Sequence, residues 1–385
     1  MYGSAGATSE PSPNSLSRGS GDFIVAHPSG VPRRELTYLD AQINDRIIAI
    51  NDYQSPRYIR EKPARIRHRA KHPTHFACLK CMDGRVHLAQ MTKTPMGIAK
   101  PFRCIGGRFR TFWHAFNERL DGLVSEATLR GTRSVVFVSY HFSRSSPQLG
   151  CAGWDYDVSA ARAHAYRLSK ELGEIYEDEL VAIPMCAETD GDLLTLHGTN
   201  GDVSGEDFID IADEDALLKI RQAMPNVDSQ TLRDIMPFLM GNAQRVAELK
   251  QNPRDLSALD HRERVMALGE GFDWLAEANF ALINNDVDPD MIKPIVTAGR
   301  ILENNLRSAP AGDDATILTS VPYSLPGKDF RLAVARSTGW QEYAQKVFRE
   351  GFPDLVKSGR LHYLNAVTFA PSKKLQVIDS GIVRL

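Results

Sequence analysis

The residues best suited to chemistry are two cysteines and a histidine, Cys81, His141 and Cys151. Zinc favours two thiolates and one imidazole, because the thiolates neutralise the divalent charge and a fourth tetrahedral position stays open for water. Asp83 and Arg85 follow Cys81 at two-residue intervals, which in an extended segment places them on the same side as that cysteine. The pattern predicts a catalytic rather than a structural zinc site.

Asp83 and Arg85 are the predicted catalytic residues of this site. A zinc ion lowers the pKa of a bound water towards about 7, and the resulting hydroxide can attack a small electrophile such as carbon dioxide. We expect Asp83 to accept a hydrogen bond from that water, or to occupy the open metal position reversibly. Arg85 would pair with Asp83 and hold it off the metal.

The other cysteines are interpreted as packing residues. Cys78 and Cys81 form a CxxC, which elsewhere marks a redox pair or half of a structural zinc site. The sequence contains no second CxxC, and alternation along a strand would turn these two side chains to opposite faces. Cys104 and Cys186 stand in apolar contexts, as does Cys78, and all three are expected to act as small buried hydrophobes.

Gly106 and Gly107 follow a predicted strand that carries Arg103. Two adjacent glycines without a third glycine, or without a Lys-Ser/Thr pair, are too weak a signal for a dinucleotide or nucleotide-phosphate loop. We interpret them as a place where the backbone approaches the metal pocket closely. Arg103, Gly106 and Gly107 are therefore the predicted pocket residues.

Size and composition set the class of protein. A chain of 385 residues is too long for one core and predicts two or three domains. With 42% hydrophobic and 24% charged residues it is typical of soluble proteins, and a net charge of −2 argues against nucleic acid or an anionic membrane as partner. No apolar run approaches the roughly 20 residues needed to span a bilayer. Five cysteines without a secretory signal indicate a reducing cytoplasm.

Patterning divides the chain into five predicted segments. The first is rich in Ser, Gly and Pro, and the second carries many Arg and Lys residues. The segments are a disordered tail (1–35), a helical and basic N-terminal arm (36–74), a zinc-binding catalytic α/β domain (75–204), a helical connector (205–262) and a degenerate α/β repeat without metal ligands (263–385). The arm could contact an anionic or protein partner, or it could wrap its own domain, and the sequence leaves both open.

Strands and helices are predicted to alternate in the catalytic domain. Expected strands are 75–79, 102–105, 134–140, 181–185 and 193–196, and expected helices are 112–129 and 158–180. A further helix, 38–52, is expected in the N-terminal arm. This order predicts an α/β fold with a mainly parallel sheet flanked by helices, whose sites collect beyond the carboxyl ends of the strands. Cys81 and His141 are both expected there.

Three segments of the first half have weak echoes in the second half. Residues 103–109 (RCIGGRF) resemble 266–272 (MALGEGF), and 134–143 resemble 315–324, which puts Pro322 at the position of His141. Residues 181–198 resemble 366–381. The echoes occur in the same order, so the sequence predicts a duplicated domain whose second copy cannot rebuild the metal site.

With these residues identified, the chain resembles the β-carbonic anhydrase superfamily. That family has a Cys-x-Asp-x-Arg strand end, matched here by Cys81, Asp83 and Arg85. It continues with a glycine-containing loop, a helix, a buried strand ending in His and a nearby Cys; these are matched by residues 103–106, 112–129 and 134–141 and by Cys151. The resemblance covers roughly residues 75–200.

Three departures narrow the resemblance. Gly84 replaces the usual Ser, nine residues separate His141 from Cys151 where ordinary members have a short gap, and the second half looks degenerate. The long gap and the second copy without ligands are similar to carboxysome-shell carbonic anhydrases, and the gap also to algal low-CO2-inducible relatives. The resemblance implies that the second copy takes the place of a partner subunit, and that higher homo-oligomers form.

The resemblance thus implies a zinc-dependent carbonic anhydrase (a lyase) that hydrates CO2 reversibly to bicarbonate by zinc-bound hydroxide. Two alternatives stay open: a zinc hydrolase for another small electrophile such as CS2 or COS, and a non-catalytic zinc scaffold or bicarbonate sensor. The expected cofactor is Zn2+ and the expected location is the cytoplasm, with the carboxysome as the second choice. The tail and basic arm could recruit a protein partner; no membrane or nucleic acid is expected.

Overall fold

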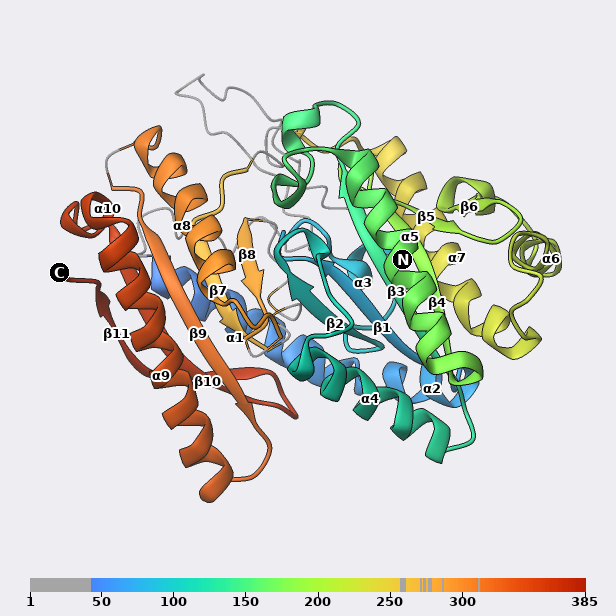
Figure 1. The fold of residues 1–385 in the computed structure, drawn as a ribbon, viewed down its shortest axis with the longest axis horizontal. Coiled ribbons are helices and arrows are strands. Elements are labelled where there is room, and N and C mark those ends of the chain that lie inside the picture. The colour runs from blue at the N-terminus through green and yellow to red at the C-terminus, as the bar shows by residue number, and fades with distance from the viewer. Residues whose placement is uncertain are drawn as a thin grey trace, which may run out of the picture.

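Two sheets lie side by side in this protein, each covered by helices (Figure 1). The computed structural model describes residues 43–256, 261–270, 272, 275, 279–285, 287–310 and 312–385. The predicted disordered tail (1–35) lies outside the described residues. The expectation of an α/β fold with mainly parallel sheets is confirmed. None of the described helices is long and apolar enough to cross a membrane.

The first sheet has six strands in the order β2-β1-β3-β4-β5-β6. Its strands are β1 (His75–Cys81), β2 (Ala99–Cys104), β3 (Ser134–Phe142), β4 (Leu180–Glu188), β5 (Leu193–His197) and β6 (Asp202–Ser204). The first four run parallel, and β5 and β6 are added antiparallel. The eight residues from Ser134 to His141 are all buried, as expected for a parallel strand covered on both faces.

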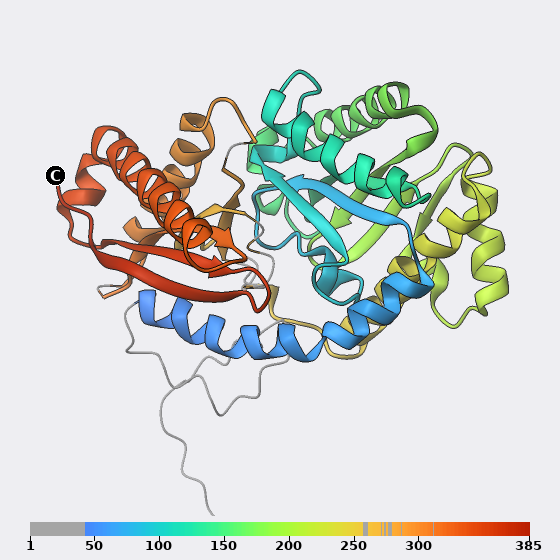
Figure 2. The ribbon, with the colours of Figure 1, turned by 90° about the horizontal axis from the view of Figure 1, so that it is seen from below.

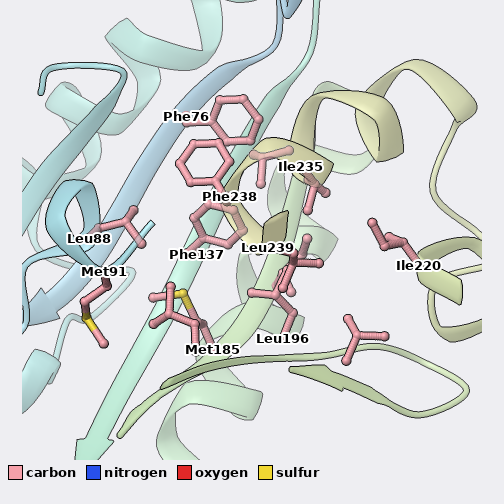
Figure 3. Packing of buried hydrophobic residues seen from close by; sticks show 14 of the residues in the cluster. Phe76, Leu88, Met91, Phe137, Met185, Leu196, Ile220, Ile235, Phe238 and Leu239 are labelled. Atoms are coloured by element: carbon pink, nitrogen blue, oxygen red, sulfur yellow. The ribbon is translucent and has the colours of Figure 1, made fainter. Parts of the chain in front are cut away.

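Successive residues of the central strands belong to different hydrophobic clusters, because side chains alternate across a sheet. One face packs against α4 (His114–Leu129) and α5 (Val158–Tyr176). The other packs against α6 (Asp213–Ala223) and α7 (Ser229–Gln251), and the short α3 (Leu88–Met91) joins it. Figure 3 shows Phe238 of α7 packing against Phe76 and Phe137, with ring centroids 4.7 and 5.4 Å apart.

The second sheet has five strands in the order β11-β10-β9-β7-β8. They are β7 (Val265–Gly269), β8 (Phe280–Ile283), β9 (Ala315–Tyr323), β10 (Leu361–Phe369) and β11 (Lys374–Ile382). Three helices follow in this half: α8 (Ile292–Arg307), α9 (Lys328–Gly351) and α10 (Pro353–Lys357). They cover one face through the cluster that contains Ile295, Leu302 and Phe348.

The two sheets repeat one strand order, with β8-β7-β9-β10-β11 corresponding to β2-β1-β3-β4-β5. β9 begins 181 residues after β3, and β10 begins 181 residues after β4. The echo of 134–143 in 315–324 therefore pairs equivalent strands in register. The third echo pairs β4 and β5 with their counterparts β10 and β11, but in a shifted register. The first echo is wrong: 266–272 overlaps β7, whose counterpart is β1, whereas 103–109 begins at the end of β2.

The N-terminal helices run beneath both halves (Figure 2). α1 (Ile43–Arg60) covers the second face of the second sheet with Ile43 and Ile47, and α2 (Lys62–Lys71) continues towards the first half. Pro63 stands in the first turn of α2, where its missing N–H is not needed and its fixed φ favours a new helix. The described part of the basic arm, from residue 43, is therefore packed on its own chain along these helices.

Backbone pairing joins the halves at the end of β1. Met82 accepts a hydrogen bond from the Leu282 N–H (2.7 Å), and Gly84 donates to the Phe280 carbonyl (3.0 Å), so residues 82–84 pair antiparallel with β8. Beside them, the Asn284 side-chain oxygen accepts from the Arg103 N–H. The Asn284 amide donates to the Gly269 carbonyl (3.1 Å). The buried Asn284 therefore ties β2 to the second sheet.

Replacing Asn284 with alanine should lower the stability of the chain. The change leaves the buried Arg103 N–H and the Gly269 carbonyl without their partner, and each such loss costs about 1–3 kcal/mol. We expect the free energy of unfolding, measured with urea, to fall by about 2–4 kcal/mol. Asn285→Ala is the matched control, because its buried amide oxygen has no hydrogen-bond partner among the described residues. Equal losses in both variants would contradict this role.

Candidate metal centre

Parallel strand ends bring two of the predicted ligands together. Cys81 is the last residue of β1, and His141 lies near the end of the neighbouring β3. Cys151 arrives from the loop after β3, just before the short 3-10 helix Ala152–Trp154. One atom from each of the three residues lies within 4.8 Å of the others, and all three are buried. The chain therefore contains a buried Cys81–His141–Cys151 group that could hold a metal ion.

The geometry of this group fits a tetrahedral metal ion. The sulfur atoms of Cys81 and Cys151 are 3.7 Å apart. Two thiolates bound at about 2.3 Å to a tetrahedral zinc would lie about 3.8 Å apart. Both ring nitrogens of His141 are buried without a hydrogen-bond partner in the described structure. A buried imidazole without a partner is costly, and a metal ligand bond would remove that cost.

The surroundings of Cys81 favour its thiolate form. The Cys151 thiol donates to the Cys81 sulfur, which lowers the pKa of Cys81 although burial alone would raise it. The adjacent His141 lowers it further. Conversely, hydrogen bonding to Cys81 and burial raise the pKa of Cys151. The pair therefore carries one readily formed thiolate, and a divalent cation would stabilise the second.

Asp83 and Arg85 form a buried ion pair beside the three ligands. The Arg85 Nε donates to both carboxylate oxygens of Asp83, at 3.0 and 3.1 Å, and the Arg85 backbone N–H donates at 2.9 Å. Burial would raise the pKa of Asp83, but the guanidinium outweighs it and holds that pKa well below its usual range. Asp83 Oδ2 lies 3.9 Å from His141 Nε2. A carboxylate whose ionised form is favoured by Arg85 therefore lies beside the ligand cluster.

The sequence analysis missed two residues at this centre, His261 and Glu263. His261 Nε2 is 3.1 Å from Arg85 Nη2 and 3.2 Å from the Gly150 carbonyl, while its Nδ1 is 3.0 Å from Glu263. Burial lowers the pKa of His261, but Glu263 and Asp83 raise it overall. These residues come from the segment before β7, so only the folding of the second half onto the first brings them here. Only the His-x-Glu spacing of these two residues could have pointed to them from the sequence.

Asp83, His261 and Glu263 also lie close enough to one another to share an ion. The Arg85 guanidinium, however, contacts both Asp83 and His261. A fixed positive charge in the middle of these groups opposes a cation. Of the two clusters, the chemistry of the donors therefore favours the Cys81–His141–Cys151 group as the metal position.

Arg103 holds the loop that follows Cys81. Its side chain is 1% exposed, and its guanidinium donates to the backbone carbonyls of Cys81 (2.9 Å), Asp83 (2.9 Å) and Val86 (3.0 Å). These bonds fix the backbone between the first ligand and the ion pair. The structure thus gives Arg103, a predicted pocket residue, a positioning role.

The predicted close approach at Gly106 and Gly107 involves the loop of Cys151. A Cβ on Gly153 would lie 2.5 Å from the Gly106 nitrogen, and the Trp154 indole donates to the Gly106 carbonyl (2.7 Å). Gly107 has φ 63° and backs onto the Ser139 carbonyl, where an added Cβ would be 3.1 Å away. The position of Cys151, the third ligand, therefore depends on the close contact between the backbones at Gly106 and Gly153.

The remaining cysteines lie in the apolar interior. Cys78 belongs to one cluster of the first half, while Cys104 and Cys186 belong to the cluster on the opposite face. Cys81 belongs to neither, because it packs with residues of the second half. Burial raises the pKa of Cys104 and of Cys186. These environments favour neutral thiols, as expected for packing residues.

Known proteins give no family assignment for this chain. No protein-family model matches it, and no curated protein matches its sequence.

Replacing Cys151 with serine should remove bound metal. A hydroxyl is a poorer zinc ligand than a thiolate, and only His141 and one thiolate would remain. We expect purified Cys151→Ser to contain less than about a tenth of the wild-type zinc, measured by atomic emission. The matched control is Cys104→Ser, in the strand beside Cys81 but in a different cluster. Full zinc in Cys151→Ser, or loss in Cys104→Ser alone, would place the third ligand elsewhere.

Replacing Gly153 with alanine should weaken metal binding without removing a ligand. The added Cβ would meet the Gly106 backbone at 2.5 Å and push the Cys151 loop away from Cys81 and His141. We expect zinc affinity, measured by competition with a chelator, to fall about tenfold or more. Gly131→Ala is the control, because nothing lies within 4 Å of a Cβ there, although its φ of 68° costs backbone strain. An unchanged zinc affinity in Gly153→Ala would show that the loop position is not limiting.

Proposed function

We propose that this protein is a zinc-dependent carbonic anhydrase that interconverts carbon dioxide and bicarbonate. The observation that carries the proposal is the buried Cys81–His141–Cys151 group next to the buried Asp83–Arg85 pair. The ring nitrogens of His141 have no hydrogen-bond partner among the described residues. Three protein ligands leave a tetrahedral ion one position for water or substrate, which is the arrangement of catalytic rather than structural zinc. The family resemblance of the sequence supports the same reaction.

Zinc would supply Lewis acidity, which makes a water nucleophilic near neutral pH. Asp83 stays ionised because of Arg85, so it accepts hydrogen bonds and donates none. With a metal held by Cys81, His141 and Cys151, Asp83 would be placed to accept a proton of a nearby water by hydrogen bonding. Arg85 is held in turn by His261, which fixes the ion pair in place.

The walls of the centre suit a small uncharged substrate. Met82 and Ile105 pack in the same cluster as Cys81 and Cys151, and Trp154 packs against that cluster. Apolar walls receive carbon dioxide without the desolvation cost that a charged substrate would bring. The same walls would accept CS2 or COS, so the hydrolase alternative shares this support.

The test is stopped-flow hydration of carbon dioxide by the purified full chain, with zinc determined on the same sample. Turnover with about one zinc per chain is the expected result. Zinc without turnover, assayed also with CS2 and COS, would overturn the carbonic anhydrase and distinguish the other hydrolase from a non-catalytic scaffold or bicarbonate sensor.

Replacing Asp83 with asparagine should slow the reaction while zinc is retained. The amide keeps an acceptor but loses its charge, and it can turn a donor towards the water. We expect kcat/KM for hydration to fall about 100-fold, which is typical for loss of a general acid–base partner, with zinc content unchanged. Asp155→Asn is the matched control: it removes the same charge from an exposed position four residues after Cys151. An unchanged rate in Asp83→Asn would remove Asp83 from the mechanism.

A further inference from the structure

A cavity lies between the two halves of the molecule. Its volume is about 330 Å³, and residues of both sheets and of the N-terminal helices line it. None of the three predicted metal ligands contributes to its walls. Cavities of about 300 Å³ and above are large enough for small organic ligands.

This cavity occupies the position in the second half that corresponds to the metal centre in the first. β3 and β9 are equivalent strands of nine residues each. Pro322 is the eighth residue of β9 and therefore corresponds to His141, the eighth residue of β3. The registers of β1 with β3 and of β7 with β9 put Glu270 in the place of Cys81. Pro322 and Glu270 both line the cavity. The positions that correspond to two of the metal ligands therefore line this cavity without offering the same ligand set.

The walls of the cavity carry an excess of positive charge. Its lining includes five cationic side chains and one acidic side chain: Arg69, Lys80, Lys100, Arg119, Lys373 and Glu270. Arg119 and Glu270 form an ion pair with an N–O distance of 2.7 Å. Glu270 is therefore already paired, and Lys80 donates to the Val86 carbonyl (3.3 Å). Arg69, Lys100 and Lys373 have no carboxylate partner among the described residues that line the cavity, so their positive charge is the part left to attract a ligand.

Lys373 is the cation that most needs a partner. It lies in the turn between β10 and β11 at φ 58°, and the structure gives its ammonium no hydrogen bond or ion pair with a described residue. The ammonium lies over the Tyr58 ring, 5.5 Å from its centroid. Burial lowers the pKa of Lys373, although Glu270 opposes the effect. An anion in the cavity would compensate this partly desolvated charge.

We propose that the cavity binds a small organic anion that carries carboxylate or phosphate groups. The volume admits a ligand several times larger than bicarbonate, and the charge selects an anion. Because Tyr58 and Arg69 line the cavity beside Glu270 and Lys373, the ligand contacts the N-terminal helices and both halves at once. Binding therefore stabilises the joined form of the chain. The second copy keeps a ligand site where its metal site would stand.

The experiment measures binding of inorganic phosphate and of citrate to the zinc-loaded full chain. Isothermal titration calorimetry gives the dissociation constants at fixed ionic strength, and thermal unfolding gives the stabilisation. We expect saturable binding of at least one of the two anions. Tighter binding of phosphate would indicate a phosphate ligand, and tighter binding of citrate a carboxylate ligand. Lys373→Gln should weaken it about tenfold, and Lys373→Arg should restore most of it.

The matched control is Lys374→Gln. Lys374 is the exposed neighbour that pairs with Asp52, and it does not line the cavity. Its loss removes the same charge and should change the dissociation constant less than twofold. Unchanged zinc content in all variants shows that they fold.

Three results would overturn the proposal. The first is the absence of saturable binding of either anion. The second is equal weakening by Lys373→Gln and Lys374→Gln, which would indicate general attraction to a basic surface. The third is binding that disappears in Cys151→Ser but survives Lys373→Gln, because that would place the anion at the metal centre. None of these measurements depends on carbonic anhydrase activity.

Discussion

The candidate centre depends on the antiparallel pairing of residues 82–84 with β8. This short ladder begins one residue after Cys81 and includes Asp83, so it fixes the segment that carries a ligand and half of the ion pair. Arg103 holds the same segment from the other side through three backbone carbonyls. A loop bound on both sides keeps little conformational freedom, and a buried charged pair needs that rigidity to keep its partners aligned.

Charge balance explains why so many ionisable groups can be buried together. Two thiolates would match a bound divalent ion, Arg85 matches Asp83, and Glu263 lies within hydrogen-bond distance of His261. Each charge has a neighbour of opposite sign, which is the condition under which burial of charge is tolerated. The first half provides the metal donors and the Asp83–Arg85 pair, and the second half provides the residues that hold Arg85. Neither sheet alone contains the complete arrangement.

The hydrophobic pattern of the sequence was enough to predict the positions of Cys81 and His141, because both lie at the ends of parallel strands. Cys81 and His141 end neighbouring strands, so strand assignment alone placed them together, and the buried run before His141 made that assignment firm. His261 and Glu263 could not be placed in this way, because their approach depends on how the halves pack and no periodicity records that. The echo between 103–109 and 266–272 failed for a related reason: a glycine pair after an apolar strand is common to many strand ends, and it led to the wrong strand. Arg103 was expected in the pocket, whereas its guanidinium is directed to backbone carbonyls.

The pairing of residues 82–84 with β8 has a consequence for how the centre responds to dilution. Both edges belong to one polypeptide, so each meets the other at an effective concentration set by the intervening chain rather than by the amount of protein in solution. The same contact made between two separate chains would be lost whenever the concentration fell below its dissociation constant. Because the two copies are joined in one chain, a metal site in the first copy would not require metal ligands in the second. Its residues can then change independently, as Glu270 and Pro322 indicate.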